Sequence, residues 1–173
     1  MAMKATEIFQ RFSDETASGI FHHLYENDKR AYRAAIQVLA NRRKLRPVLL
    51  ERKPRTERHA WMRHELSRPL NEDAATEILQ AWVLGAHQAM VIQFLDDLSV
   101  PHDGRGLLDT LPEEPPADKL RAAIDGLFEK HPADAVFAYL HLFAAMDITE
   151  WPTLKQIITE DPRLCPTPQT LAA

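Results

Sequence analysis

The sequence predicts an all-α protein of about eight to ten helices, and three observations point to this fold class. Apolar residues recur at i, i+3, i+4 and i+7 along most of the chain, which is the spacing of one face of a helix. The twelve prolines stand at or between these segments, as expected of a residue that lacks an amide donor and clashes with the preceding turn. Only five glycines occur, and no stretch alternates polar and β-branched residues as a strand would.

Five helices are expected in the first part of the chain. Ile20, Phe21 and Leu24 belong to one apolar stripe, and Ser13 before it is a favoured N-cap residue. A second stripe of the same spacing follows Asp28. The predicted spans are 5–12, 14–26, 29–43, 47–52 and 57–67.

Five more helices are expected in the rest of the chain. One follows Asn71, and Glu72 and Asp73 in its first turn suit the positive end of a helix dipole. Pro132 opens another helix and Pro162 stops the last one. The predicted spans are 72–85, 87–98, 117–130, 132–145 and 150–160.

Short connections pair these helices into three αα-hairpins, at 14–43, 72–98 and 117–145, arranged as a compact bundle or a short solenoid-like stack. A similar apolar rhythm about 44 residues apart in the last two pairs is suggestive of helical repeats. Ile78 to Leu98 is alternatively one long helix with a kink near Gly85. We predict a single domain over residues 1–162 and a flexible tail over 163–173.

Composition favours a soluble, cytoplasmic protein. The only cysteine, Cys165, has no disulfide partner, and the N-terminal residues contain no apolar core of a secretory signal. The longest near-apolar run, Ala135 to Met146, is shorter than the roughly twenty residues of a membrane span. We therefore expect no membrane partner, and no motif calls for a cofactor.

The charge is sorted along the chain, although the net charge is only −4. Residues 29–68 carry thirteen Lys and Arg against three acids, a local balance of +10. Such clusters bind phosphate backbones, so RNA or DNA is one candidate ligand. The other interpretation is that the segment is solvated or docks on the acidic C-terminal half of the chain. The candidate binding residues are Arg42, Arg43, Lys44, Arg46, Arg52, Lys53, Arg55 and Arg58.

A weaker hypothesis concerns a metal-dependent enzyme. Asp96, Asp97, His102 and Asp103 lie within eight residues, and carboxylates with an imidazole suit a divalent metal. The sequence around them, with Pro101 and Gly104, is typical of a turn, which favours a structural role for the same side chains.

The leading functional hypothesis is a non-catalytic protein–protein interaction module. No nucleophile elbow, phosphate-binding loop or dinucleotide motif is present, so the sequence does not favour an enzyme. Stacked helical hairpins offer grooves for partner segments. The connector from Ser99 to Asp118 is unusually long, and its prolines and the acids Glu113 and Glu114 would suit an exposed docking strip.

Overall fold

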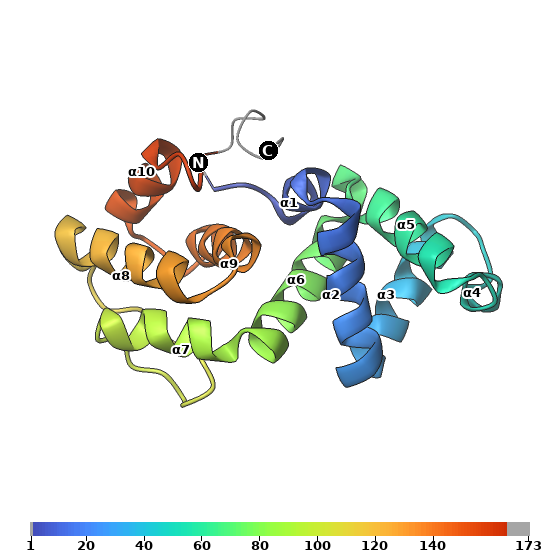
Figure 1. Ribbon diagram of the computed structural model, residues 1–173, viewed down its shortest axis with the longest axis horizontal. Coiled ribbons are helices and arrows are strands. Elements are labelled where there is room, and N and C mark those ends of the chain that lie inside the picture. The colour runs from blue at the N-terminus through green and yellow to red at the C-terminus, as the bar shows by residue number, and fades with distance from the viewer. Residues whose placement is uncertain (1, 166–173) are drawn as a thin grey trace. The chain divides into compact units, whose positions relative to one another are not determined.

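The computed structural model describes residues 2–165 and folds them into ten α-helices and one 3₁₀ turn, with no strand in that range (Figure 1). The all-α prediction is confirmed. The contacts divide the chain into an N-terminal unit, Lys4–Trp82, and a C-terminal unit formed by residues 2–3 and the described chain from Val83 onward. That residues 1–162 behave as one domain stays a prediction.

The N-terminal unit is built on α2 (Asp14–Asn27), which packs against both α3 (Lys29–Arg42) and α5 (Arg55–Leu66). The expected cap at Ser13 forms, because its Oγ accepts the N–H of Thr16 at 3.1 Å, and Asp28 Oδ1 likewise accepts the N–H of Ala31 at 3.1 Å. The elements are α1 (Ala5–Arg11), α2 (Asp14–Asn27), α3 (Lys29–Arg42), α4 (Pro47–Glu51), α5 (Arg55–Leu66), η1 (Pro69–Asn71) and α6 (Glu72–Ala86).

Glu72, at the start of α6, serves a different helix from the one the sequence suggests. Its carboxylate accepts the N–H groups of Ala5 and Thr6 at 2.6 and 3.0 Å, and the hydroxyl of Thr6 at 2.8 Å. The first N–H groups of a helix have no partner within it, so this carboxylate caps α1. The contact ties the beginning of the unit to its last helix.

The C-terminal unit places aromatic side chains at its centre. Phe143 lies against Phe94, Tyr139 and Trp151, with ring centroids 5.4 to 6.0 Å apart. These separations fall in the range of favourable aromatic pairs. The helices are α7 (Gln88–Asp97), α8 (Ala117–Lys130), α9 (Ala133–Ala145) and α10 (Pro152–Glu160).

The predicted hairpins form at the two ends of the chain, where α2 packs on α3 and α8 on α9. The middle prediction is wrong as an antiparallel pair, because the segment containing α6 and α7 is bent by 84°. The bend lies at His87, whose carbonyl starts α7 by accepting the N–H groups of Met90 and Val91. The alternative of one long helix with a kink near Gly85 is closer in placing a bend here, but the helix is interrupted at His87, two residues beyond Gly85.

The long connector after α7 is held in place at several points. Gly106 has a φ of 93°, and a Cβ there would come within 2.6 Å of the Val91 side chain, so only glycine fits. Trp151 Nε1 donates to the carbonyl of Pro112 at 3.1 Å. Glu114 accepts the N–H groups of Thr153 and Leu154, both at 3.0 Å. Glu114, expected on an exposed strip, instead caps α10.

His141 is a hydrogen-bonded core residue, as its apolar helix suggests, and it is fully buried. Its Nδ1 accepts the N–H of Met3 at 2.9 Å, so Nε2 carries the proton and donates to the carbonyl of Leu164 at 2.9 Å. Leu164 is buried as well. Residues 163–165 are thus packed on the C-terminal unit, and the rest of the predicted tail lies outside the described residues.

Within the part of the chain that the structure describes, no single helix is long and apolar enough to cross a membrane. The residues from Pro69 to Ala86 and α7 reach that length and composition only together, across the 84° bend.

Candidate binding surface

The eight basic candidates separate into four that are engaged within the N-terminal unit and four that face outward. Arg58 is the most deeply engaged, because its guanidinium donates to the carbonyls of Leu50, Glu51 and Lys53 at 2.7 to 3.0 Å. These carbonyls lie at or just beyond the C-terminal end of α4, where helical partners are lacking. Arg58 therefore fixes the position of α4 and is not available to a ligand.

Arg58 also connects to a buried histidine. Its Nη1 donates to the hydroxyl of Tyr32 at 3.2 Å, and that hydroxyl lies 3.1 Å from Nε2 of His59. On the other side of the ring, Nδ1 lies 3.3 Å from the hydroxyl of Ser18. Burial above all, and then the nearby positive charge of Arg58 and Arg55, lowers the pKa of His59 to about 4. His59 is therefore neutral at physiological pH.

Three further candidates make contacts that hold them to the same unit. Arg43 contacts the buried carboxylate of Glu65 through Nε and Nη2 at 2.8 to 3.0 Å. Arg42 donates to the carbonyl of Leu70, and the guanidinium of Arg55 lies 4.3 Å from the ring centre of Tyr25.

Glu65 is the main internal counter-charge of the basic segment. It is 2% exposed, and Arg68 shares its carboxylate with Arg43 at 3.2 Å. Burial raises the pKa of Glu65, but the hydrogen bonds from Arg43 and Arg68 outweigh this and hold it below its usual range. Part of the segment is thus neutralised inside its own unit.

The other four cations surround α4. The side chains of Lys44, Arg46, Arg52 and Lys53 are exposed, and they form no hydrogen bond or ion pair within residues 2–165. Between them lie three exposed aliphatic side chains, Leu45, Val48 and Leu49, which are 38%, 43% and 50% exposed. We call these seven residues the α4 surface.

The three aliphatic residues are functional candidates that the charge pattern alone did not reveal. Leu50 is the buried residue of α4, at 1% exposure, and the neighbouring Val48 and Leu49 are left exposed. In the sequence, the signal for this aliphatic surface is the run of three consecutive apolar residues, Val48 to Leu50, between cations.

A second feature of the N-terminal unit is a groove between α3 and α6, with a volume of about 260 Å³. We call it the α3–α6 groove. Small and apolar side chains line it from both helices, and two exposed acids stand on its α6 side. Its lining includes Ala31, Ala34, Val38, Asp73, Ala74 and Glu77.

The proposed metal ligands are engaged in a turn. His102 Nδ1 accepts the N–H of Gly104 at 3.0 Å, so Nε2 is protonated and donates to Asp96 at 2.8 Å. Asp103 accepts the N–H groups of Arg105 and Leu107, and the bond from Arg105 above all lowers its pKa. Over the described chain, no three His, Cys, Asp or Glu side chains are grouped to hold a metal ion. Metal binding stays a prediction.

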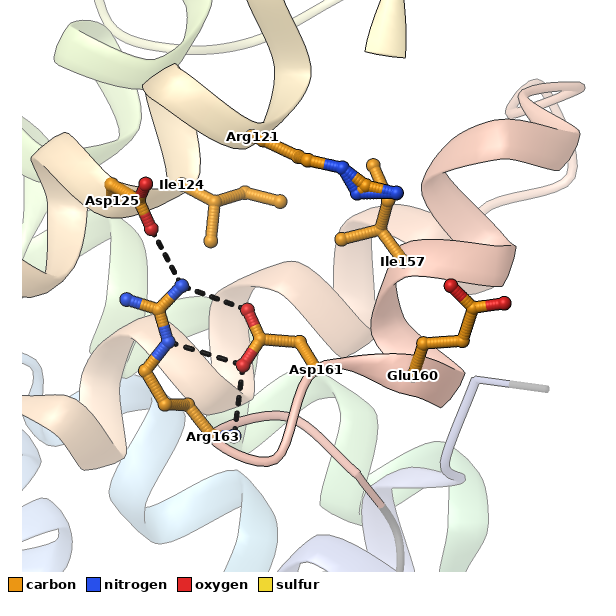
Figure 2. A pocket seen from close by; sticks show the side chains of 7 residues that line it. All are labelled: Arg121, Ile124, Asp125, Ile157, Glu160, Asp161 and Arg163. Carbon is orange, nitrogen blue, oxygen red and sulfur yellow. Dashed lines mark hydrogen bonds and ion pairs between the residues drawn. The ribbon is translucent and has the colours of Figure 1, made fainter. Parts of the chain in front are cut away.

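The C-terminal unit has an open hollow of about 220 Å³ between α8 and the end of α10 (Figure 2). Arg163 spans it, donating to Asp125 at 2.6 Å and to Asp161 at 2.8 Å, and it also stacks on Phe128. Arg121 extends over the hollow toward Ile157. Both this hollow and the α3–α6 groove are smaller than the roughly 300–1,000 Å³ of typical small-molecule sites. We assign the Arg163 contacts to anchoring the chain after α10.

Comparisons of this chain with protein-family models, with curated proteins and with solved structures find no match.

Proposed function

We propose that this chain is a non-catalytic protein-interaction module and that it binds its partner through the α4 surface. The observation that carries the proposal is the mixture of exposed aliphatic side chains and cations without a hydrogen bond or ion pair among the described residues, on and around one short helix. Single exposed apolar residues are ordinary, but a group of them rimmed by polar residues is typical of an interaction site.

The backbone at Lys44 supports the same proposal. Lys44 has a φ of 56°, in the left-handed region that glycine usually occupies after the end of a helix. A side chain in this conformation costs roughly 1 kcal/mol or more. A lysine kept at this cost is understandable if its charge serves binding, since it lies beside Leu45 and Arg46 at the edge of the α4 surface.

The chemistry of the surface favours a protein over a nucleic acid. Single-stranded RNA and DNA are bound through aromatic side chains on which bases stack, whereas the α4 surface offers leucine and valine. Four of the basic candidates already make contacts within the N-terminal unit, which leaves four without such a contact for phosphates. We infer a partner segment with acidic residues next to apolar ones, the mode in which an amphipathic helix binds a hydrophobic surface.

The test is a selection of peptides from a displayed random library on the full-length chain. We expect enriched peptides to combine Asp or Glu with large apolar residues at helical spacing. Their binding should be lost in Val48→Asp/Leu49→Asp and weakened in Lys44→Glu/Arg46→Glu. Matched controls are Leu107→Asp and Ile148→Asp, which change equally exposed apolar residues of the C-terminal unit and should bind as the unchanged chain does.

Two results would overturn the proposal. One is enrichment of peptides that bind the α4 variants and the unchanged chain equally. The other is that no peptide is enriched while a single-stranded RNA binds with a slope of log K against log salt near −3, as expected of about four neutralised phosphates. That second result would establish the anionic-ligand alternative at the same four cations.

A further inference from the structure

The α3–α6 groove presents the opposite charge to the α4 surface, and it belongs to the same unit. Asp73 and Glu77 lie one helical turn apart on α6, both exposed, and they form no hydrogen bond or ion pair among the described residues. The side of the groove on α3 is apolar, with Val38 at 40% exposure. The groove thus combines acidic and apolar side chains, which complement the cationic and aliphatic side chains of the α4 surface.

We propose that the α3–α6 groove binds the α4 surface of a second copy of this chain. In this arrangement Val48 and Leu49 of one copy cover the alanines and Val38 of the other, while Lys44 and Arg46 approach Asp73 and Glu77. The inference rests on the proposed function of the α4 surface and names one partner for it.

The occupant has to be another molecule, because the α4 of the same chain is held elsewhere. The guanidinium of Arg58 donates to the carbonyls of Leu50 and Glu51 at the end of α4, and the side chain of Leu50 is buried. The size of the groove also favours protein side chains, since about 260 Å³ is below the range of typical small-molecule sites.

Arg42 lines the groove as well, and among the described residues it forms no ion pair with Asp73 or Glu77. Its guanidinium donates to the carbonyl of Leu70, which turns its charge toward η1. The groove therefore keeps an acidic side on α6 and an apolar side on α3. Opposite charges at the rim are expected to set the orientation of docking and to make association weaker as salt rises.

Two different surfaces meet in this contact, so each copy offers one of each and the association is heterologous. Such contacts close into a ring where the rotation between copies allows, and otherwise continue as an open chain. The mass of the assembly distinguishes these forms, and neither form changes the proposed pair of surfaces.

The experiment is sedimentation analysis of the full-length protein over a concentration series at low and at moderate salt. We expect the mass to rise above the 19.8 kDa of one chain as concentration increases, and to rise less at moderate salt. Asp73→Lys/Glu77→Lys and Lys44→Glu/Arg46→Glu should each stay monomeric. Glu26→Lys, which reverses an exposed acid of α2 outside the groove lining, should associate as the unchanged chain does.

The most informative measurement mixes the two charge-reversed variants, Asp73→Lys/Glu77→Lys and Lys44→Glu/Arg46→Glu. The reversed groove of one then faces the reversed α4 surface of the other, and the unreversed pair also remains, so the mixture should associate although neither variant does alone. If a reversed variant loses its helical circular dichroism, Asp73→Asn/Glu77→Gln and Lys44→Gln/Arg46→Gln replace the pair, and each should weaken association at low salt.

A monomeric unchanged chain at every concentration overturns the inference, as does association that the charge changes leave intact. Failure here is distinct from failure of the proposed function. Peptides that still depend on Val48 and Leu49 while the chain stays monomeric would support the α4 surface and exclude a second copy as its partner.

Discussion

Arg58 and Tyr32 are joined by a hydrogen bond of 3.2 Å from the guanidinium to the phenolic hydroxyl. Because the other donors of Arg58 hold the end of α4, this bond links the α4 surface to the buried imidazole of His59. The guanidinium can only donate, so the Tyr32 oxygen accepts from it and its own hydrogen is free for His59 Nε2. The basic segment is therefore stabilised in part by hydrogen bonds between its own residues.

Arg58→Ala should destabilise the protein and loosen α4. The change leaves the carbonyls of Leu50, Glu51 and Lys53 without their charged donor, which we expect to cost about 2–3 kcal/mol of unfolding free energy. Chemical denaturation gives the stability, and faster amide exchange at Arg52 and Lys53 reports on α4. Arg52→Ala, an exposed cation on the same surface, is the control and should stay within about 0.5 kcal/mol. Equal stability of the two variants would contradict the role given to Arg58.

His59 should make stability depend on pH between its two pKa values. The pKa of His59 is lowered from 6.5 to about 4, so in this window the unfolded chain takes up a proton that the folded protein does not. Stability is then fully present above pH 6.5 and falls as the pH drops toward 4, by up to about 3 kcal/mol. Denaturation at a series of pH values should show a smaller fall in His59→Gln. An imidazole signal of His59 that titrates near 6.5 would refute this.

The sequence predicted the helices well because their causes are local. Ser13 acts as the cap that the pattern predicts, and nearly every span agrees with the structure to within a few residues. The bend at His87 was not predictable in the same way, since the residues on both sides favour helix and the direction of the second helix is set by packing.

The sequence also did not predict which cations of the basic segment make contacts within the fold and which remain exposed. Whether Arg58 or Arg52 faces outward depends on carbonyls and carboxylates that the fold brings near, such as Glu65 beside Arg43. Glu72 and Glu114 are two further examples, because each caps a helix that is distant from it in the sequence. Local spacing contains no information about such partners.

Lys44→Gly should raise stability and weaken partner binding at once. Glycine adopts the φ of 56° at this position without the steric cost that lysine pays, and we expect a gain of about 1 kcal/mol. The same change removes one cation from the α4 surface, so affinity for the selected acidic peptides should fall. Lys53→Gly, beyond the end of α4 and not in a left-handed conformation, should give no gain. A loss of stability in Lys44→Gly would contradict this account.

Tyr139→Phe should leave the fold intact and increase its stability. The hydroxyl of Tyr139 is buried and has no hydrogen-bond partner among the described residues, and burial raises its pKa above the usual range. A buried polar group without a partner costs about 1–3 kcal/mol, so its removal should recover part of that amount. Thermal and chemical unfolding measure the change. Tyr32→Phe is the matched control and should destabilise, because its hydroxyl is bonded to Arg58 and His59.

Glu114→Gln should weaken the beginning of α10 and the connector together. Both carboxylate oxygens accept backbone N–H groups, from Thr153 and Leu154, at the positive end of the helix dipole. An amide keeps one good acceptor and removes the charge, so we expect a loss of about 1 kcal/mol. Amide exchange at Thr153 and Leu154 should accelerate. Glu113→Gln changes the neighbouring exposed acid and should have no effect on either measurement; equal behaviour of the two variants would show that Glu114 does not cap α10.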